Sequence, residues 1–289
     1  MFIAIASHQR PAQLQEKTLA LLKKHKFNFN NVYVFVSPES YNEYLPISVK
    51  WKFHLIESKN SILTTRNHII QHFKEGAEIV EMDDDVEDIE TTLKGTKNKS
   101  VSNLKQLFED SFKLIREKGE GDNGLWGFNA NTNNFYADGK DKIGLYSIIN
   151  SCCGYINRKT IKMTVSEKED FERCILMFKR GYPILKRCGY GVKTKYWTNK
   201  GGIQGHYGFE KRKKVQSDSA MTLMEKYPEY CYTKVRPNGI VDIRFRRLKH
   251  PPAEKSASNK KVSNRKIKSP NRKRKSPNRK RKSPNRKRK

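Results

Sequence analysis

Residues 78–86 read Glu-Ile-Val-Glu-Met-Asp-Asp-Asp-Val, an unusual way for a strand to end. The apolar run from Ala77 to Val80 is typical of a buried strand, and three consecutive carboxylates follow it. Adjacent carboxylates repel one another and raise one another's pKa values. A hard divalent cation relieves the repulsion, because Mg²⁺ and Mn²⁺ bind oxygen ligands and keep positions open for phosphate oxygens. Asp83 and Asp85 are therefore predicted to hold a metal and a nucleotide diphosphate, with a solvated acidic loop as the alternative.

Strands and helices are predicted to alternate on both sides of this stretch. The predicted strands cover residues 1–6, 31–37, 51–57 and 77–82, and the predicted helices cover 14–25 and 62–73. This alternation favours βαβ units and an α/β fold of the Rossmann-like type, with a mostly parallel sheet flanked by helices. Ligands of such sheets bind beyond the carboxyl ends of the strands. Ser7 and Arg10 follow the first strand, so they are expected at the same edge as the triple Asp and are candidates for binding the nucleotide diphosphate.

The pattern is less regular after residue 100. A helix is predicted over 101–118, an aromatic and Asn-rich segment over 125–136, a helix from the N-cap Ser166 to Gly181, a short helix over 223–227 and a strand over 240–245.

The positive charge of the chain is concentrated at its end. Of the formal net charge of +30, the residues from Lys249 onward carry 19 basic side chains and one acidic side chain. We therefore divide the chain into a folded domain, 1–248, and a basic tail, 249–289. The tail ends in three copies of Ser-Pro-Asn-Arg-Lys-Arg-Lys. Each copy contains proline and no apolar anchor, which predicts disorder.

The basic tail also indicates a partner. Its repeats are similar to the Ser-Pro-basic repeats of histone tails, which lie along the DNA minor groove, so DNA is the expected partner. A nuclear import signal is the competing interpretation.

Cysteine usage and hydropathy indicate the compartment. The five cysteines form no CxxC pair and no zinc spacing, which favours reduced thiols in a cytosolic or nuclear protein. No segment reaches the roughly 18 apolar residues of a membrane span, and the apolar start is too short for a signal peptide. We expect a soluble intracellular protein without a membrane partner, nuclear or virus-associated if the host is eukaryotic.

Four blocks of sequence, in this order, resemble the TET-associated glycosyltransferases, which are similar to the base J glucosyltransferase. The blocks are IASHQRPAQLQEKTLALLKK, RNHIIQHFKEGAEIVEMDDDVEDI, LWGFNANTNNFY and SEKEDFERCILMFKRG. The order of helical Arg66-Asn67, a strand and Asp83-x-Asp85 also resembles the nucleotide-sugar half of GT-A fold glycosyltransferases. The resemblance covers roughly residues 2–245.

The resemblance implies transfer of a sugar from a UDP-sugar to a hydroxyl, with a hydroxymethylated pyrimidine base in DNA as the expected acceptor. A glycan or protein acceptor is the first alternative. A non-catalytic nucleic-acid-binding protein is the second, and it leaves the triple Asp unexplained.

The resemblance assigns donor-site roles to particular residues. Asp83 and Asp85 would hold Mn²⁺ or Mg²⁺ against the diphosphate, and His206 in the loop GGIQGHYG would be a third metal ligand. Arg66 and Asn67 would lie near the donor, although Arg66 could equally brace an Asp through an ion pair. Asp84 receives no role.

Asp170 is the candidate general base, in the Glu-Asp pair that opens a predicted helix. A helix N-terminus lowers the pKa of an Asp, which would keep this base ionised. The alternative is that Glu169 and Asp170 only complement the helix dipole. Glu167, Glu169 and Glu172 are expected to be surface residues or partners of the dipole, and Arg173 to pair with Glu172 or reach the site.

Trp126, Asn129 and Asn134, with Asn133 and Phe135, are candidates for an acceptor shelf. Amides would read base edges and aromatic rings would stack on a flipped base. Core aromatics beside an Asn-rich turn are the alternative.

Overall fold

The structure is a computed structural model that describes residues 1–119, 122–135, 137–194 and 209–252. Met1–Pro252 form one compact unit. The basic tail beyond this unit and the loop that carries His206 lie outside the described residues.

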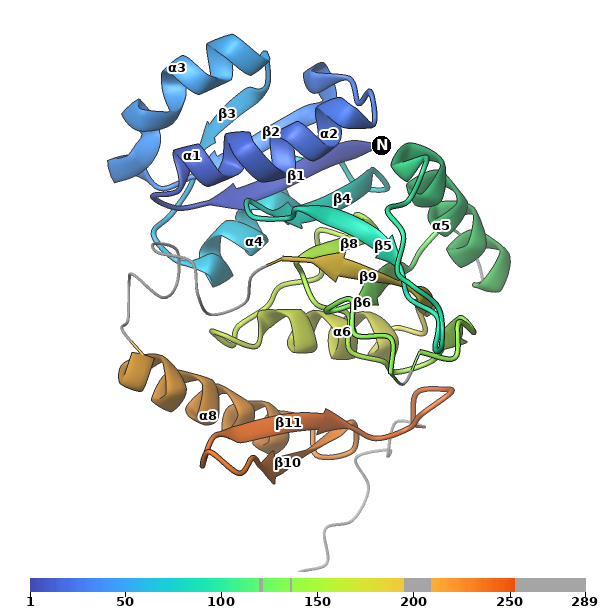
Figure 1. Cartoon of the computed structure of the whole chain (residues 1–289). Coiled ribbons are helices and arrows are strands. Elements are labelled where there is room, and N and C mark those ends of the chain that lie inside the picture. The colour runs from blue at the N-terminus through green and yellow to red at the C-terminus, as the bar shows by residue number, and fades with distance from the viewer. Residues whose placement is uncertain (120–121, 136, 195–208, 253–289) are drawn as a thin grey trace, which may run out of the picture. The chain divides into compact units, whose positions relative to one another are not determined.

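The described strands build one large sheet and one hairpin. The sheet strands are β1 (Phe2–Ser7), β2 (Val32–Val36), β3 (His54–Glu57), β4 (Glu78–Asp83), β5 (Asp88–Thr91), β6 (Leu125–Asn129), β7 (Lys142–Ile143), β8 (Cys152–Ile156) and β9 (Ile184–Lys193). Their order is β3-β2-β1-β4-β8-β6-β9-β5, with β7 paired to β9 (Figure 1). The hairpin consists of β10 (Cys231–Val235) and β11 (Val241–Phe245).

Strand direction confirms the predicted α/β class. Within the described sheet, β1, β2, β3, β4, β6 and β9 point one way, and β5, β7 and β8 run against them. The sheet is thus mostly parallel. Parallel pairing of β1 and β4 sets Ala6 beside Asp83, so Ser7 and the triple Asp leave the sheet at the same edge.

Helices cover both faces of the sheet. They are α1 (Pro11–Leu14), a π-helical turn (Gln15–Leu19), α2 (Ala20–Lys24), α3 (Tyr41–Trp51), α4 (Ile62–His72), α5 (Leu104–Lys118), α6 (Glu169–Lys179) and α8 (Phe209–Lys226), with 3-10 turns at Phe29–Asn31 and Pro38–Ser40. The expected helices over 14–25, 62–73 and 101–118 are present. The Ser61 hydroxyl accepts a hydrogen bond from the Thr64 amide at 3.2 Å and so caps α4.

The buried apolar side chains form two clusters, one on each face. Ile3 and Ile5 belong to the cluster under α2, α3 and α5, whereas Ala4 belongs to the cluster under α4, α6 and α8. Successive strand residues point to opposite faces, so a strand that is apolar at every position is buried on both. β4 is also buried on both faces, with Val80 and Met82 in one cluster and Ile79 in the other, although the charged Glu81 lies among them.

Three expectations about elements are wrong. The predicted strand 51–57 is only β3, because α3 occupies the preceding residues up to Trp51 despite Pro46 within it. The predicted short helix 223–227 is the end of α8, an 18-residue helix whose first half is too basic to show an apolar stripe. The helix predicted to be capped by Ser166 begins at Glu169, and its N-cap residue, Lys168, makes no side-chain capping bond.

Two further findings concern the cysteines and membrane-spanning helices. All five cysteines are buried free thiols. Across the described parts of the chain, no helix combines the length and apolar character needed to cross a membrane.

Candidate functional site

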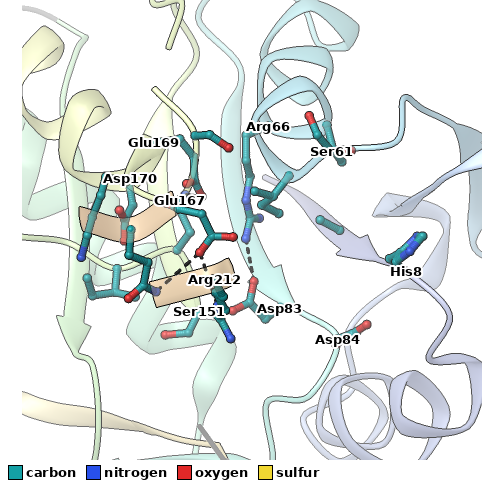
Figure 2. A pocket seen from close by; sticks show the side chains of 18 of the residues that line it. His8, Ser61, Arg66, Asp83, Asp84, Ser151, Glu167, Glu169, Asp170 and Arg212 are labelled. Atoms are coloured by element: carbon teal, nitrogen blue, oxygen red, sulfur yellow. Dashed lines mark hydrogen bonds and ion pairs between the residues drawn. The ribbon is translucent and has the colours of Figure 1, made fainter. Parts of the chain in front are cut away.

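A cavity of about 430 Å³ lies at the carboxyl ends of β1 and β4. Its polar lining includes Ser7, His8, Arg10, Lys59, Asn60, Ser61, Arg66, Asp83, Asp84, Asp85, Asn150, Ser151, Glu167, Lys168, Glu169, Asp170, Arg212, Gln216, Arg236 and Asp242. Figure 2 shows Glu167, Glu169 and Asp170 on one side of the cavity, His8 and Ser61 on the other, and Asp83 between them. The structure therefore brings the triple Asp and the start of α6 to one cavity.

Asp83 presents its carboxylate to this cavity. Arg66 Nη2 donates to Asp83 Oδ1 at 2.6 Å (Figure 2). The Asp83 side chain is 38% exposed, whereas that of Arg66 is 2% exposed. The buried Arg66 thus braces Asp83 through an ion pair, which is one of the two roles predicted for Arg66.

Asp84 and Asp85 are held by residues that follow β1. Ser7 Oγ donates to Asp84 Oδ2 at 2.6 Å, and Ser7 Oγ also lies 2.6 Å from the Tyr44 hydroxyl. Arg10 Nη1 lies 3.2 Å from Asp84 Oδ1 and 3.5 Å from Asp85 Oδ2. Ser7 and Arg10 therefore contact the triple Asp directly, and Asp84, which received no role from the sequence, is the buried centre of this group.

Desolvation makes the ionised forms of Asp83 and Asp84 unfavourable. It raises the pKa of the partly exposed Asp83 to about 6 and that of the buried Asp84 to about 7, although Arg66 and Arg10 act in the opposite direction. Repulsion from Asp85 raises both pKa values further. A cation placed against these carboxylates would favour their ionised forms.

The donor set suits a hard divalent cation. Asp83 and Asp85 both line the cavity and offer oxygen atoms only. Within the described residues, no group of three or more His, Cys, Asp or Glu side chains is arranged to hold a metal. Two carboxylates are nevertheless enough for Mg²⁺, which usually completes its shell with phosphate oxygens and water. The predicted third ligand, His206, lies outside the described residues.

A buried ionic cluster lies beneath Asp83, and the sequence analysis missed it. Glu81 accepts from Arg66 Nη1 at 3.1 Å and from Arg173 Nη1 and Nη2 at 2.9 and 3.0 Å. The Tyr155 hydroxyl donates to Glu81 at 2.6 Å, and Arg173 also donates to Asn150. The sequence did contain a sign of this cluster: Glu81 lies among apolar residues of β4, and Arg66 and Arg173 lie on the buried sides of α4 and α6. This cluster ties β4, α4, β8 and α6 together.

Asp170 enters the cavity from the first turn of α6. Its Oδ1 accepts from the Phe171 amide at 2.8 Å. Burial first, and repulsion from Glu169 second, raise the pKa of Asp170 to about 7, whereas Lys168 acts to lower it. The Phe171 amide at the helix N-terminus acts to lower this pKa, but desolvation outweighs it, so the expectation of a low net pKa is wrong. A carboxylate that titrates near neutral pH is well suited to general base catalysis.

The other acidic residues near the start of α6 are buried, so their expected surface position is wrong. Glu167 Oε2 lies 3.4 Å from Arg212 Nε, and Glu169 accepts from Asn150 at 3.4 Å. Glu172 accepts from the Thr164 and Val165 amides and from Lys226 at 2.7 Å. Arg173 pairs with Glu81 instead of Glu172.

Three residues predicted to contact the acceptor have partners within the protein. Trp126 is completely buried in the core, 5.3 Å from the Phe108 ring centre, so its role in a stacking shelf is wrong. Asn129 donates to the Cys188 carbonyl at 2.9 Å, and Asn134 donates to the Thr96 carbonyl at 2.7 Å. The structure thus shows the core alternative for Trp126, whereas the Phe135 ring is 60% exposed and its acceptor role stays a prediction.

Asn67, expected near the donor, holds a backbone segment in place. Its amide donates to the Met163 carbonyl at 2.8 Å and accepts from the Met163 amide at 3.0 Å. Both ends of the side-chain amide are therefore occupied by the chain itself, which corrects the donor-contact prediction.

Comparison with known proteins identifies the fold. No family model and no curated protein matches the sequence. The solved mannosyltransferase PcManGT of Pyrobaculum calidifontis, in complex with GDP-Man and Mn²⁺, matches with a TM-score of 0.51 and 11% identity over 78% of this chain and 64% of that one. This chain thus matches just under two thirds of the mannosyltransferase.

Two further structures match less closely. Glucosyl-3-phosphoglycerate synthase of Mycobacterium tuberculosis, in complex with UDP, has a TM-score of 0.48 and 10% identity over 86% of this chain and 89% of that one. S. aureus TarS 1–349 has a TM-score of 0.46 and 11% identity over 78% and 66%. At such low identity the comparisons establish architecture alone: the chain has the GT-A type α/β fold found in the mannosyltransferase.

Proposed function

We propose that this protein is a metal-dependent glycosyltransferase that moves a sugar from a UDP-sugar to a hydroxyl acceptor. One observation carries the proposal: Asp83 and Asp85, the candidate metal ligands, line the same cavity as Asp170, the candidate base. A cavity of about 430 Å³ falls in the size range of small-molecule sites. Glycosyl transfer requires a group that activates the donor and a base that deprotonates the acceptor. Asp83 and Asp85 are placed for the first task, and Asp170 is placed for the second in the same cavity.

In this proposal the donor diphosphate lies against the triple Asp. Asp83 and Asp85 would hold Mn²⁺ or Mg²⁺, and such an ion would neutralise the charge that develops on the leaving diphosphate. Arg66 fixes one oxygen of Asp83, and Arg10 contacts Asp84 and Asp85, so the carboxylates keep one orientation.

Asp170 takes the proton of the acceptor hydroxyl in this scheme. One carboxylate oxygen is oriented by the Phe171 amide, and the carboxylate lies on the α6 side of the cavity. Attack from the side opposite the leaving diphosphate would invert the anomeric centre, so the proposal includes an inverting reaction.

The proposed acceptor is a hydroxymethylated pyrimidine base in DNA. Two features support it: the resemblance to the TET-associated glycosyltransferases, and the basic tail, which suits a polyanion. A glycan or protein acceptor remains the competing proposal.

The test uses the full chain with Mn²⁺, a panel of UDP-sugars, and duplex DNA that carries hydroxymethyl-pyrimidines or unmodified bases. We expect UDP release that depends on the modified DNA and a matching mass increase of the base. Asp170→Asn is the matched control, because it is nearly isosteric and cannot accept the proton. UDP release without any DNA product would refute the acceptor, and no UDP release with any sugar would refute the activity.

A further inference from the structure

The β10–β11 hairpin carries a concentration of positive charge on the folded unit. Residues 231–247 contain five basic side chains and one acidic side chain, Asp242. All five basic residues are exposed: Lys234, Arg236, Arg244, Arg246 and Arg247. This charge lies outside the tail: Lys234 and Arg244 belong to the two strands, Arg236 to the turn between them, and Arg246 and Arg247 directly follow β11.

The two faces of the hairpin differ in character. Cys231 and Ile243 belong to the core cluster under α8, and Phe245 packs against that cluster. The opposite face carries Tyr232, paired across the strands with Arg244, and Lys234, paired with Asp242. One face therefore fixes the hairpin to the protein, and the other presents cations and an exposed tyrosine.

Two residues of the hairpin also line the cavity of the candidate site. Asp242 accepts from Lys168 at 3.1 Å and from Arg236 at 2.6 Å, and both Arg236 and Asp242 line the cavity. Lys168 directly precedes the acidic pair that opens α6. Asp242 thus holds the hairpin beside the candidate base, and its single negative charge is shared among Lys168, Arg236 and, at 3.7 Å, Arg244.

The outer cations have few acidic partners. In the described part of the chain, neither Lys234 nor Arg247 makes an ion pair, and Arg244 only approaches Asp242 at 3.7 Å. Arg246 lies 5.9 Å from the Tyr232 ring, which is 45% exposed. Exposed cations interleaved with an exposed aromatic ring are characteristic of surfaces that follow a nucleic-acid backbone.

We infer that the outward face of the β10–β11 hairpin, formed by Tyr232, Lys234, Arg244 and Arg246, binds the sugar-phosphate backbone of a nucleic acid and guides it to the cavity. This inference deepens the proposed function and rests on it for the identity of the acceptor. Chain order supports it, because the hairpin is followed within a few residues by the basic tail, so hairpin and tail offer a continuous run of cations to one polyanion.

The experiment compares full-length protein with the triple variant Lys234→Ala, Arg244→Ala, Arg246→Ala. Binding to an unmodified fluorescent DNA duplex is measured by anisotropy over a salt series, without sugar donor. Each lost phosphate contact makes the slope of log K against log salt shallower by about 0.9, so we expect a decrease of about 2 to 3. A second variant, Arg244→Lys with Arg246→Lys, retains the charges and should keep the wild-type slope.

A matched control removes the same charge elsewhere on the full chain. Lys23, Lys50 and Lys113 are exposed residues of α2, α3 and α5. Their joint replacement by Ala should leave the slope within about 0.5 of wild type, since they make no phosphate contact in this proposal. Thermal unfolding of every variant checks that the fold persists.

The outcomes separate this inference from the proposed function. A wild-type slope in the hairpin variant, or an equal decrease in the α2, α3 and α5 control, would overturn the inference even if the protein glycosylates DNA. A decreased slope confined to the hairpin variant would support the inference even if no sugar reaches DNA, in which case the proposed acceptor alone fails. Weaker binding to heparin with unchanged binding to DNA would assign the surface to an acidic glycan and overturn it too.

Discussion

Glu81→Gln tests the buried cluster that links the triple Asp to α6. The Glu81 side chain is 0% exposed, and those of Arg66 and Arg173 are 2% and 1% exposed. Burial acts to raise the pKa of Glu81, yet Arg173 and Arg66 hold it below its usual value. The carboxylate is therefore ionised at neutral pH and balances two buried guanidinium groups.

The loss of stability expected for Glu81→Gln depends on the partners that Arg66 and Arg173 keep. Arg66 keeps Asp83 as a partner at 2.6 Å, but Arg173 loses the one carboxylate with which it pairs in the described residues. Removal of one member of a buried ion pair costs about 3–5 kcal/mol, because the other charge stays buried without compensation. For a domain of this size each kcal/mol lowers Tm by about 2–4 °C, so a decrease of roughly 6–20 °C is expected.

Glu78→Gln is the matched control on the same strand. Glu78 pairs with Arg116 at 2.6 Å and with the amino terminus at 3.7 Å, and its side chain, unlike that of Glu81, is partly exposed at 24%. Exposed pairs contribute about 0–1 kcal/mol, so this variant should unfold within a few degrees of wild type.

The assay is denaturant unfolding of both variants, followed by a double-mutant cycle. Glu81→Met combined with Arg173→Met removes both charges, and it should recover much of the stability lost in Glu81→Met alone. Equal unfolding free energies for Glu81→Gln and Glu78→Gln, or strictly additive losses in the cycle, would refute the reasoning that Glu81 balances buried arginines.

Four further predictions concern the cavity and the tail. Burial raises the pKa of Asp84 to about 7, so the folded state binds this proton more tightly than the unfolded chain does. Without metal, this group therefore makes the protein more stable as the pH falls from 8 to 6. Asp84→Asn should abolish that part of the pH dependence of thermal unfolding. Asp83→Ala or Asp85→Ala should abolish Mn²⁺-dependent UDP binding in calorimetry, and binding that survives both changes and EDTA would remove the metal site. Asp170→Asn should lower turnover by about 10²–10⁴ with donor binding unchanged, and near-normal turnover would reduce Asp170 to a structural residue. Deletion of the residues after Leu248 should preserve UDP-sugar hydrolysis but make the salt dependence of DNA binding shallower. Equal slopes of log K against log salt for the full-length and truncated proteins would favour the import-signal interpretation.

Local pattern was enough to predict much of the framework. The apolar runs before Ser7 and before Asp83 identified two strands, and parallel strands place their carboxyl ends together, so the meeting of Ser7, Arg10 and the triple Asp followed from sequence. Amphipathic spacing predicted α4 and α5 because one face of each is buried. These features depend on neighbours within a few residues.

Tertiary structure decided what depends on distant partners. The sequence identified Asp170 as a candidate, but only folding brings it to the cavity of Asp83 and raises its pKa through burial. Glu81 acquires its role from Arg66 and Arg173, which belong to two different helices. Trp126 is another example, because an aromatic residue in a strand fits a binding shelf and a core equally well until its neighbours are known. Periodicity determines which face of an element is buried, but the partners that meet there, and the desolvation that sets their protonation, are properties of the assembled fold.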